Sequence, residues 1–280
     1  MKNEECERIE RLTKDRIVSI SPLGGGDICR VYRLNFERRG SAVVKISDTG
    51  GLDAEADGLK ELRRPGVIDV PEVWASEKDI LVMEEIPRAS ERAGFFEEFG
   101  RRLAALHEVK SERFGYRRDN RIGHLPQRNT SESSAAEFFR KHRLGFLVEY
   151  GRKRRRVSGE LFAAVQKVCD RLEDWFAPIQ EPPALLHGDL WSGNFLSGPR
   201  GPVLIDPAVY YGPREADLAM TRLFGGFPRR FYDAYEEAAP LPEGWSERVD
   251  LFNLYHLLTH TIMFGGGYER QALAAAKRYI

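Results

Sequence analysis

Short hydrophobic runs rich in strand-forming residues, separated by polar or glycine turns, fill most of the first third of the chain, and this pattern predicts a sheet. The strands are expected at residues 16–23, 28–36, 41–46, 73–75 and 80–85. A glycine triplet, Gly24-Gly25-Gly26, separates the first two of them. Between the third and fourth strands, apolar residues at helical spacing predict one helix over 52–62.

The remaining two thirds change to the spacing of amphipathic helices, expected at residues 95–107, 138–150, 161–176 and 251–264. The polar segment 115–134 is longer than connections usually are in compact domains, which is typical of a functional loop or of disorder. The pattern predicts an α+β protein of two lobes. The small β-rich lobe spans 1–87 and ends in a linker near Pro87, and the larger helical lobe spans 88–280.

Composition excludes several classes of protein. Lysine plus arginine and aspartate plus glutamate number 43 each, so a basic balance suited to nucleic acid or an anionic membrane is absent. No stretch approaches the roughly 18 apolar residues of a membrane span, and the charged, helix-like N-terminus lacks a signal-peptide core. Three cysteines, Cys6, Cys29 and Cys169, have no metal-ligand spacing. We therefore expect reduced thiols and a cytoplasmic protein, and the oligomeric state stays open.

The chemistry-bearing residues lie near the middle of the chain. Asp189, in His187-Gly188-Asp189, precedes Asn194 with the Asp-x-x-x-x-Asn spacing of a kinase catalytic loop. Asp206 follows the short apolar run 203–205, where the metal-binding aspartate of a kinase is found. A carboxylate at Asp189 can accept a hydroxyl proton, and oxygens of Asn194 and Asp206 suit Mg²⁺.

The first lobe holds the matching partners in the expected order. Gly24-Gly25-Gly26 can cover phosphates because glycine lets backbone N–H groups approach closely, although a plain hairpin turn would look the same. Lys45 is placed to bind phosphate, and Glu55, ten residues on in the predicted helix, to orient it. Glu84 and Ile86 end the last strand of this lobe, where backbone groups would bind adenine. The ordered set predicts a protein-kinase-like fold that uses ATP and Mg²⁺.

At this level of detail the sequence resembles the fructosamine kinase (ketosamine-3-kinase) family, a relative of aminoglycoside phosphotransferases and choline kinases. The resemblance rests on the loop 187–194, with Trp191 and Ser192-Gly193, and on matching segments from about residue 17 to the end. These segments are 119–129, 143–144, 206–212, 214–220, 224–227 and 260–268.

Membership of that family would imply transfer of the ATP γ-phosphate to the C3 hydroxyl of an amine-linked ketose, a ketosamine. The phosphorylated adduct would fall apart and free the amine, which is a deglycation repair role. The resemblance makes Trp191 an aromatic platform for the sugar, with lobe packing as the alternative, and brings His260 near the acceptor pocket. Pro213 and Ala135-Ala136 depart from the family pattern and put the exact substrate in doubt.

Other functions stay open beside this one. The acceptor could be an aminoglycoside, choline or homoserine, although aminoglycoside enzymes favour acidic acceptor pockets. The chain could also be a nucleotide-binding pseudokinase, but every phosphoryl-transfer position is filled. His256 and His260 share a helix face, yet no glutamate follows His256, so helix packing is favoured over a metal site.

Two smaller features carry weaker interpretations. The basic run 152–156 could bind acidic partners or nucleic acid, but the neutral overall charge favours a solvated surface. Cys29 follows the glycine triplet by three residues, so its oxidation could disturb nucleotide binding. A buried structural cysteine is the simpler interpretation.

Overall fold

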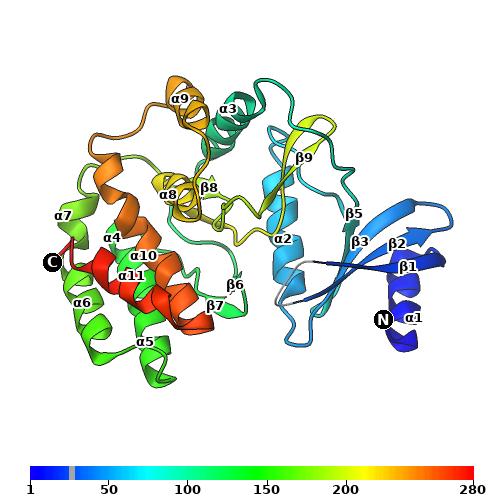
Figure 1. Cartoon of the computed structure of the whole chain (residues 1–280), viewed down its shortest axis with the longest axis horizontal. Coiled ribbons are helices and arrows are strands. Elements are labelled where there is room, and N and C mark those ends of the chain that lie inside the picture. Colours follow the sequence, from blue (N-terminus) through cyan, green and yellow to red (C-terminus); the bar gives the residue numbers. More distant parts are fainter. Residues whose placement is uncertain (25–28) are drawn as a thin grey trace. The chain divides into compact units, whose positions relative to one another are not determined.

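Five antiparallel strands form the predicted sheet, in the order β1-β2-β3-β5-β4 (Figure 1). They are β1 (Ile17–Leu23), β2 (Arg30–Phe36), β3 (Gly40–Ile46), β4 (Val73–Ser76) and β5 (Ile80–Glu84). The computed structural model describes residues 1–24 and 29–280, so Gly25 and Gly26 lie outside the described residues. Every strand expected in the first third is present, which confirms the prediction made from its strand-forming residues.

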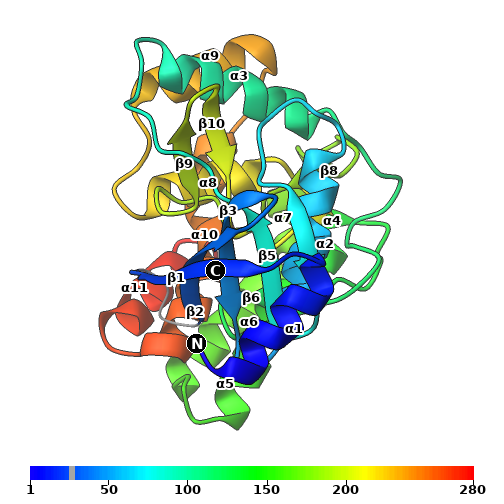
Figure 2. The same cartoon turned by 90° about the vertical axis from the view of Figure 1, so that its right-hand side faces the viewer.

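A helix packs on each face of this sheet. Ala42, Val44 and Ile46 of β3 are buried on one face, against Ile9 of α1 (Asn3–Thr13). Successive side chains of a strand point to opposite faces, so Lys45 points to the other one. The helix α2 (Leu52–Arg63) lies on that face, where its Glu55 bonds to Lys45. Figures 1 and 2 show α1 and α2 on opposite sides of the sheet.

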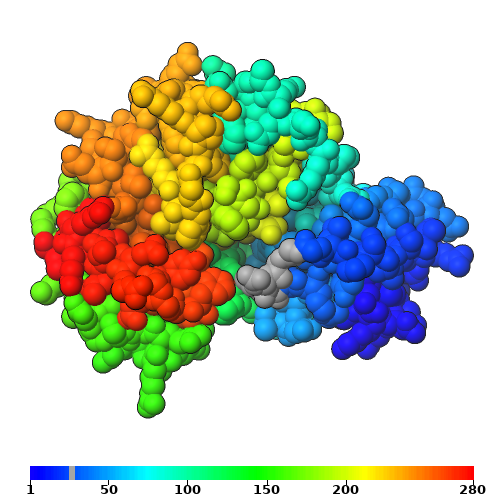
Figure 3. Space-filling view, in the orientation of Figure 1, coloured from blue at the N-terminus to red at the C-terminus, as the bar shows by residue number. Residues whose placement is uncertain are grey.

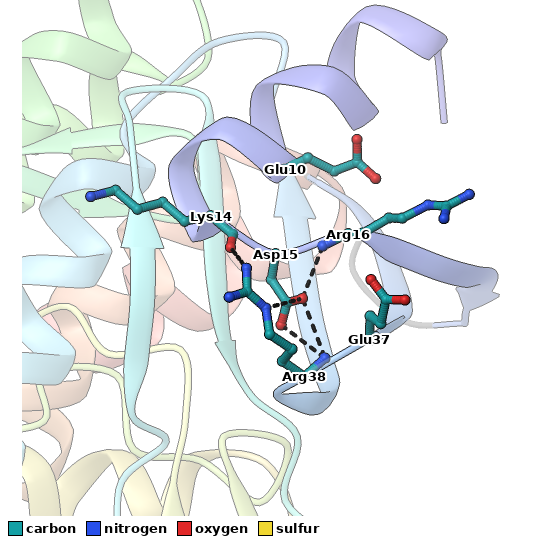
Figure 4. Close-up of a pocket in the computed structure, with 6 residues that line it drawn as sticks. All are labelled: Glu10, Lys14, Asp15, Arg16, Glu37 and Arg38. Atoms are coloured by element: carbon teal, nitrogen blue, oxygen red, sulfur yellow. Dashed lines mark hydrogen bonds and ion pairs between the residues drawn. The ribbon is translucent and has the colours of Figure 1, made fainter.

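A polar pocket of about 430 Å³ lies where α1 ends and β1 begins (Figure 4). Its lining residues are Glu10, Lys14, Asp15, Arg16, Glu37 and Arg38. The Asp15 carboxylate accepts hydrogen bonds from the backbone N–H groups of Arg16 (2.9 Å) and Arg39 (3.0 Å). These bonds connect the end of α1 to the turn between β2 and β3, so we interpret the residues of this pocket as structural.

The chain divides into two compact units. The sheet unit comprises residues 1–95 and 195–207, and the helical unit comprises 96–194 and 208–280. The sheet unit therefore extends beyond the boundary predicted at residue 87 and takes in a distant hairpin, β9 (Phe195–Gly198) with β10 (Gly201–Leu204). Two backbone bonds hold that hairpin in place, Leu204 N to Asp69 O (2.9 Å) and Ala89 N to Ser197 O (2.8 Å).

The helical unit contains most of the helices. They are α3 (Phe95–His107, with Phe95 in the sheet unit), α4 (Ala135–Phe138), η1 (Phe139–Leu144), α5 (Gly145–Lys153), α6 (Gly159–Asp170), α7 (Leu172–Phe176), α8 (Glu215–Leu223), α9 (Arg229–Ala238), α10 (Trp245–Phe264) and α11 (Gly267–Ala276). A short sheet pairs β8 (Ala184–Leu186) with β11 (Tyr210–Gly212). The sequence pattern missed α8, α9 and α11, and it predicted single helices where η1 and the break at Arg171 interrupt the α-helical path.

The centre of this unit is aromatic. Phe176 and Phe252 stack with ring centroids 5.1 Å apart, and Phe139 meets both rings edge-on at 5.2 Å. The long helix α10 is buried along most of its length, and the residues that the predicted helix 251–264 left out, 245–250, are its mostly exposed or half-buried first turns. The short helix α11 covers part of the unit's surface (red in Figure 3).

The long polar segment 115–134 is ordered around the hairpin β6 (Asn120–Ile122) and β7 (Leu125–Gln127). Its amides bond to one another: Asn120 Oδ1 accepts from Gln127 Nε2 (2.8 Å) and from Asn129 Nδ2 (2.9 Å). Tyr255 donates its hydroxyl to Gln127 Oε1 (2.8 Å). Of the two alternatives left open, a functional loop or disorder, the structure contradicts disorder, because each of these amides bonds to a partner inside the protein.

Arg143 holds the end of this segment through hydrogen bonds. Its side chain is fully buried and donates to Asn129 Oδ1 at 2.9 Å. Three rings surround the guanidinium, with centroids 4.0 Å (Tyr210), 4.4 Å (Phe138) and 5.4 Å (Tyr255) away. The buried cation is therefore accommodated by carbonyls, an amide and aromatic faces.

Among the described residues, no helix is long and apolar enough to cross a membrane. Cys6, Cys29 and Cys169 are all free thiols. Burial raises the pKa of Cys29, so its thiol has no enhanced thiolate character.

Candidate active site

Lys45 forms the centre of a charged cluster in the sheet unit. Its Nζ lies 2.7 Å from Glu55 Oε1 and 2.5 Å from Asp206 Oδ1. The antiparallel pairing of β3 with β5 holds the lysine, α2 supplies the glutamate, and the residues after β10 supply the aspartate. The structure thus brings together three residues that the sequence assigned to nucleotide and metal binding.

The two neighbouring carboxylates favour the protonated form of Lys45. Burial alone would lower the pKa of Lys45, but Glu55 and Asp206 outweigh that effect and raise it. Burial, together with the charge of Asp206, raises the pKa of Glu55, and Lys45 opposes the shift. A permanently charged ammonium held by two carboxylates is suited to binding phosphate oxygens.

Asp206 adopts an unusual backbone conformation. Its φ of +56° lies in the left-handed region, which non-glycine residues rarely occupy and aspartate tolerates better than most. Such strain persists only where the surroundings enforce it, and it gathers at functional sites. Here it accompanies a side chain that is 43% exposed and uses one oxygen for Lys45.

In the helical unit, Asn194 bonds back to earlier residues of the predicted catalytic loop. The Nδ2 atom of Asn194 donates to the backbone O of Asp189 (2.8 Å) and to its Oδ2 (3.1 Å). The backbone N–H of Asn194 also donates to Trp191 O (3.0 Å). Because Nδ2 is turned inward, the amide oxygen remains as the acceptor atom of Asn194.

Asp217 of α8 holds the start of the same loop. Its carboxylate accepts the backbone N–H groups of His187 (2.7 Å) and Gly188 (2.8 Å) and lies 3.3 Å from His107 Nε2. Burial would raise the pKa of Asp217, but the bonds to His107 and Gly188 prevail and lower it. A Cβ on Gly188 would lie 2.1 Å from Ala208 O, so glycine is required there.

Sequence reasoning missed this supporting role. Asp217 was noticed only as part of a family-like segment, and its neighbour His107 is fully buried between Asp217 and Tyr235. An available signal was the position of Asp217 within the apolar run of a short helix, where an unpaired carboxylate would be costly.

Trp191 and His260 belong to one aromatic cluster, together with Phe224, Phe264 and Tyr268. Phe224 links them, with ring centroids 6.2 Å from Trp191 and 4.8 Å from His260. Tyr268 lies 5.0 Å from His260, and Phe264 lies 5.5 Å from it. Trp191 is 37% exposed and Phe264 is 51% exposed, so the cluster presents an apolar surface to solvent.

Two details fix the chemistry of this surface. A Cβ on Gly193 would lie 2.4 Å from the indole of Trp191, so the glycine lets the ring lie over the loop. His260 Nδ1 donates to His256 O (2.9 Å), which leaves Nε2 of the neutral ring as an acceptor. Burial lowers the pKa of His260 and favours that neutral form.

The remaining predicted nucleotide contacts stay predictions. Glu84 ends β5, and its backbone N–H already donates to Glu72 O (2.8 Å), so this N–H is taken within the sheet unit. Ile86 is half-buried, and Gly24 has open space around its Cα. The last two glycines of the triplet lie outside the described residues.

A sheet with a buried lysine–glutamate pair, followed by a mainly helical unit with an Asp-x-x-x-x-Asn loop, defines a kinase of the protein-kinase-like fold, and so an enzyme that uses ATP. The chain belongs to the fructosamine kinase family, whose model matches residues 1–280.

Individual relatives agree with this assignment. A probable ketoamine kinase from Enterococcus faecium is 38% identical over 260 residues, covering 90% of this chain and 92% of the relative. The chloroplastic protein-ribulosamine 3-kinase of Oryza sativa subsp. indica is 36% identical over 278 residues, covering 95% and 80%. A crystal structure of a candidate fructosamine-3-kinase from Thermobifida fusca has a TM-score of 0.91 at 36% identity, covering 100% and 99%.

Proposed function

We propose that this kinase transfers the γ-phosphate of ATP to the C3 hydroxyl of ketosamines, with ribulosamines and fructosamines as acceptors. The observation that carries the proposal is the exposed aromatic ring of Trp191 on the same short loop as Asp189 and Asn194. A sugar adduct offers hydroxyl groups and an apolar ring face, which suit an aromatic platform beside a few polar groups. The rice relative, a ribulosamine kinase, supports the same acceptor class.

Each polar residue then has a definite task. Asp189 accepts the proton of the attacking hydroxyl, and Asn194 fixes the orientation of its carboxylate. Lys45 binds phosphate oxygens, and Glu55 holds the lysine in place. Release of the amine from the phosphorylated adduct would make the role deglycation repair.

The residues present fit magnesium. Sequence spacing assigns Asn194 and Asp206 as oxygen ligands, and Mg²⁺ is usually held by one or two carboxylates with phosphates and water. Within residues 1–24 and 29–280, no group of three or more histidine, cysteine or acidic side chains could hold a metal. When bound, the ion would neutralise charge on the transferring phosphate.

An aminoglycoside acceptor fits less well. A polycationic drug would gain from clustered carboxylates, whereas the surface around Trp191 is made by Phe224, His260, Phe264 and Tyr268. A single ammonium, as in a ketosamine or choline, suits aromatic faces through cation–π attraction. Choline and homoserine therefore remain as controls in the assay.

The test is a phosphate-transfer assay of the purified protein with ribulose-lysine, fructose-lysine, kanamycin, choline and homoserine. We expect turnover of the ketosamines, with ³¹P and ¹³C NMR placing the phosphate on C3, and little turnover of the others. Robust kanamycin or choline phosphorylation without ketosamine turnover would overturn the acceptor assignment. Binding of ATP without any transfer would favour the pseudokinase.

A further inference from the structure

His256 of α10 is buried to 5% exposure, and its Nδ1 has no hydrogen-bond partner among the residues that the structure describes. A buried polar atom without a partner is uncommon and calls for an explanation. The nearest acidic group is the carboxylate of Asp189, whose Oδ1 lies 3.8 Å from that nitrogen.

A different side chain lies near each carboxylate oxygen of Asp189. Asn194 Nδ2 donates to Oδ2 at 3.1 Å, and His256 Nδ1 faces Oδ1. A distance of 3.8 Å is too long for a hydrogen bond, but contacts of catalytic groups are often long without substrate and shorten in the complex. A movement of about 1 Å would make the second bond.

We propose that His256 is a positioning residue for phosphoryl transfer: its Nδ1–H holds Oδ1 of Asp189, as Asn194 holds Oδ2, so that the carboxylate faces the acceptor hydroxyl. The inference rests on the proposed function, since it needs Asp189 to be the base.

The surroundings keep the imidazole neutral. Burial lowers the pKa of His256 to about 3, and the charge effects of His260 on the same helix and of Arg143 act in the same direction. Asp217 of α8 acts in the opposite direction without prevailing. A neutral ring carries one N–H, and a carboxylate facing Nδ1 favours the tautomer with its proton there.

The test compares three substitutions. His256→Asn places an amide N–H near the position of Nδ1, His256→Gln carries the same amide farther out, and His256→Leu removes the donor. We expect kcat to fall roughly tenfold or more in the leucine and glutamine variants, as for partners that orient a functional group. Most of that loss should be recovered in the asparagine variant, and KM for ATP should stay unchanged in all three.

A double-mutant comparison separates positioning from simple packing. In an Asp189→Asn background, His256→Leu should cause little further loss of kcat, because its partner is already altered. An unchanged kcat in His256→Leu, or an equal loss in both backgrounds, would overturn the inference. Thermal melting and ATP titration show whether each variant is folded, and the glutamine variant provides a polar replacement if leucine disturbs the helix.

The wild-type enzyme separates this inference from the function on which it rests. Ketosamine turnover by wild-type protein with an unaffected His256→Leu variant would refute only the positioning role. Wild-type protein that transfers phosphate to no acceptor would refute the proposed function, and the inference with it.

Discussion

The charged cluster around Lys45 and the aromatic cluster around Trp191 are built on different principles. Lys45 is buried and bonded to Glu55 and Asp206 at 2.7 and 2.5 Å. Trp191 is held by ring contacts and by the space above Gly193, and more than a third of its surface is exposed. Phosphate chemistry is the same for every acceptor and rewards fixed charges. An acceptor surface made of ring faces can accommodate adducts that differ in sugar or amine.

This contrast predicts that changes on the charged side abolish transfer, whereas changes on the aromatic side alter the choice of acceptor. Loss of Asp206 should have the largest effect. We expect Asp206→Ala to abolish magnesium-dependent activity, because it removes a proposed metal ligand and one partner of Lys45. Calorimetry should find nucleotide affinity nearly indifferent to magnesium. Asp48→Ala, an exposed carboxylate of the same unit, is the matched control, and an unchanged magnesium response would remove Asp206 from the site.

Replacement of the base should come next. Asp189→Asn keeps the shape of the side chain but cannot accept the hydroxyl proton, and we expect kcat to fall by roughly 10²–10⁴-fold. ATP affinity should stay close to that of the wild type, as measured by titration. Asp174→Asn, at an exposed position of α7, should leave both quantities unchanged. A loss of less than about tenfold in a folded variant would contradict the assignment.

The aromatic side should respond more mildly and more selectively. We expect Trp191→Ala to lower kcat/KM for ketosamines by roughly tenfold, because an aromatic contact contributes about 0.5–1.5 kcal/mol beyond its buried area. ATP affinity should not change. Gly193→Ala should give a similar defect by displacing the ring. Trp245→Ala, where the indole packs on Arg222, is the control. Equal losses for ATP and acceptor binding would show that Trp191 only packs.

The smallest effect concerns stability against pH. Burial lowers the pKa values of His107, His256 and His260 in the folded protein. As pH falls through about 6.5, these histidines therefore become protonated in the unfolded chain but stay neutral in the folded protein. The free energy of unfolding is therefore unaffected by these histidines above about pH 6.5. Below that pH it decreases, by about 1.4 kcal/mol per pH unit for a fully buried histidine. Urea unfolding at pH 7.5 and 5.5 should reveal the loss, and His256→Asn should reduce it. Equal stability at both pH values would contradict this account.

The sequence predicted the parts of the fold that depend on local pattern. Runs of strand-forming residues between turns located all five strands of the first sheet, and the spacing of Lys45 and Glu55 anticipated a contact that the structure contains. The pairing of Asn194 with Asp189 follows from the same kind of short-range spacing.

Contacts between distant residues were beyond that reasoning. The apolar run around Asp217 indicates that its carboxylate has a buried partner, but not that this partner is the backbone of residues 187 and 188. The histidine pair 256 and 260 suggested helix packing, and the approach of His256 to Asp189 depends on how α10 crosses the catalytic loop. The polar segment 115–134 was misleading for the same reason, since its partners, such as Tyr255, come from far along the chain.

The membership of residues 195–207 in the sheet unit has a consequence for dissecting this protein. The polypeptide passes from one unit to the other after residues 95, 194 and 207, so neither unit is a continuous stretch of sequence. A fragment ending at residue 95 would lack β9 and β10, leaving Asp69 O and Ala89 N without their hairpin partners. An isolated sheet unit would have to be made by joining residue 95 to residue 195 through a designed linker, because no continuous segment of the chain contains all of it.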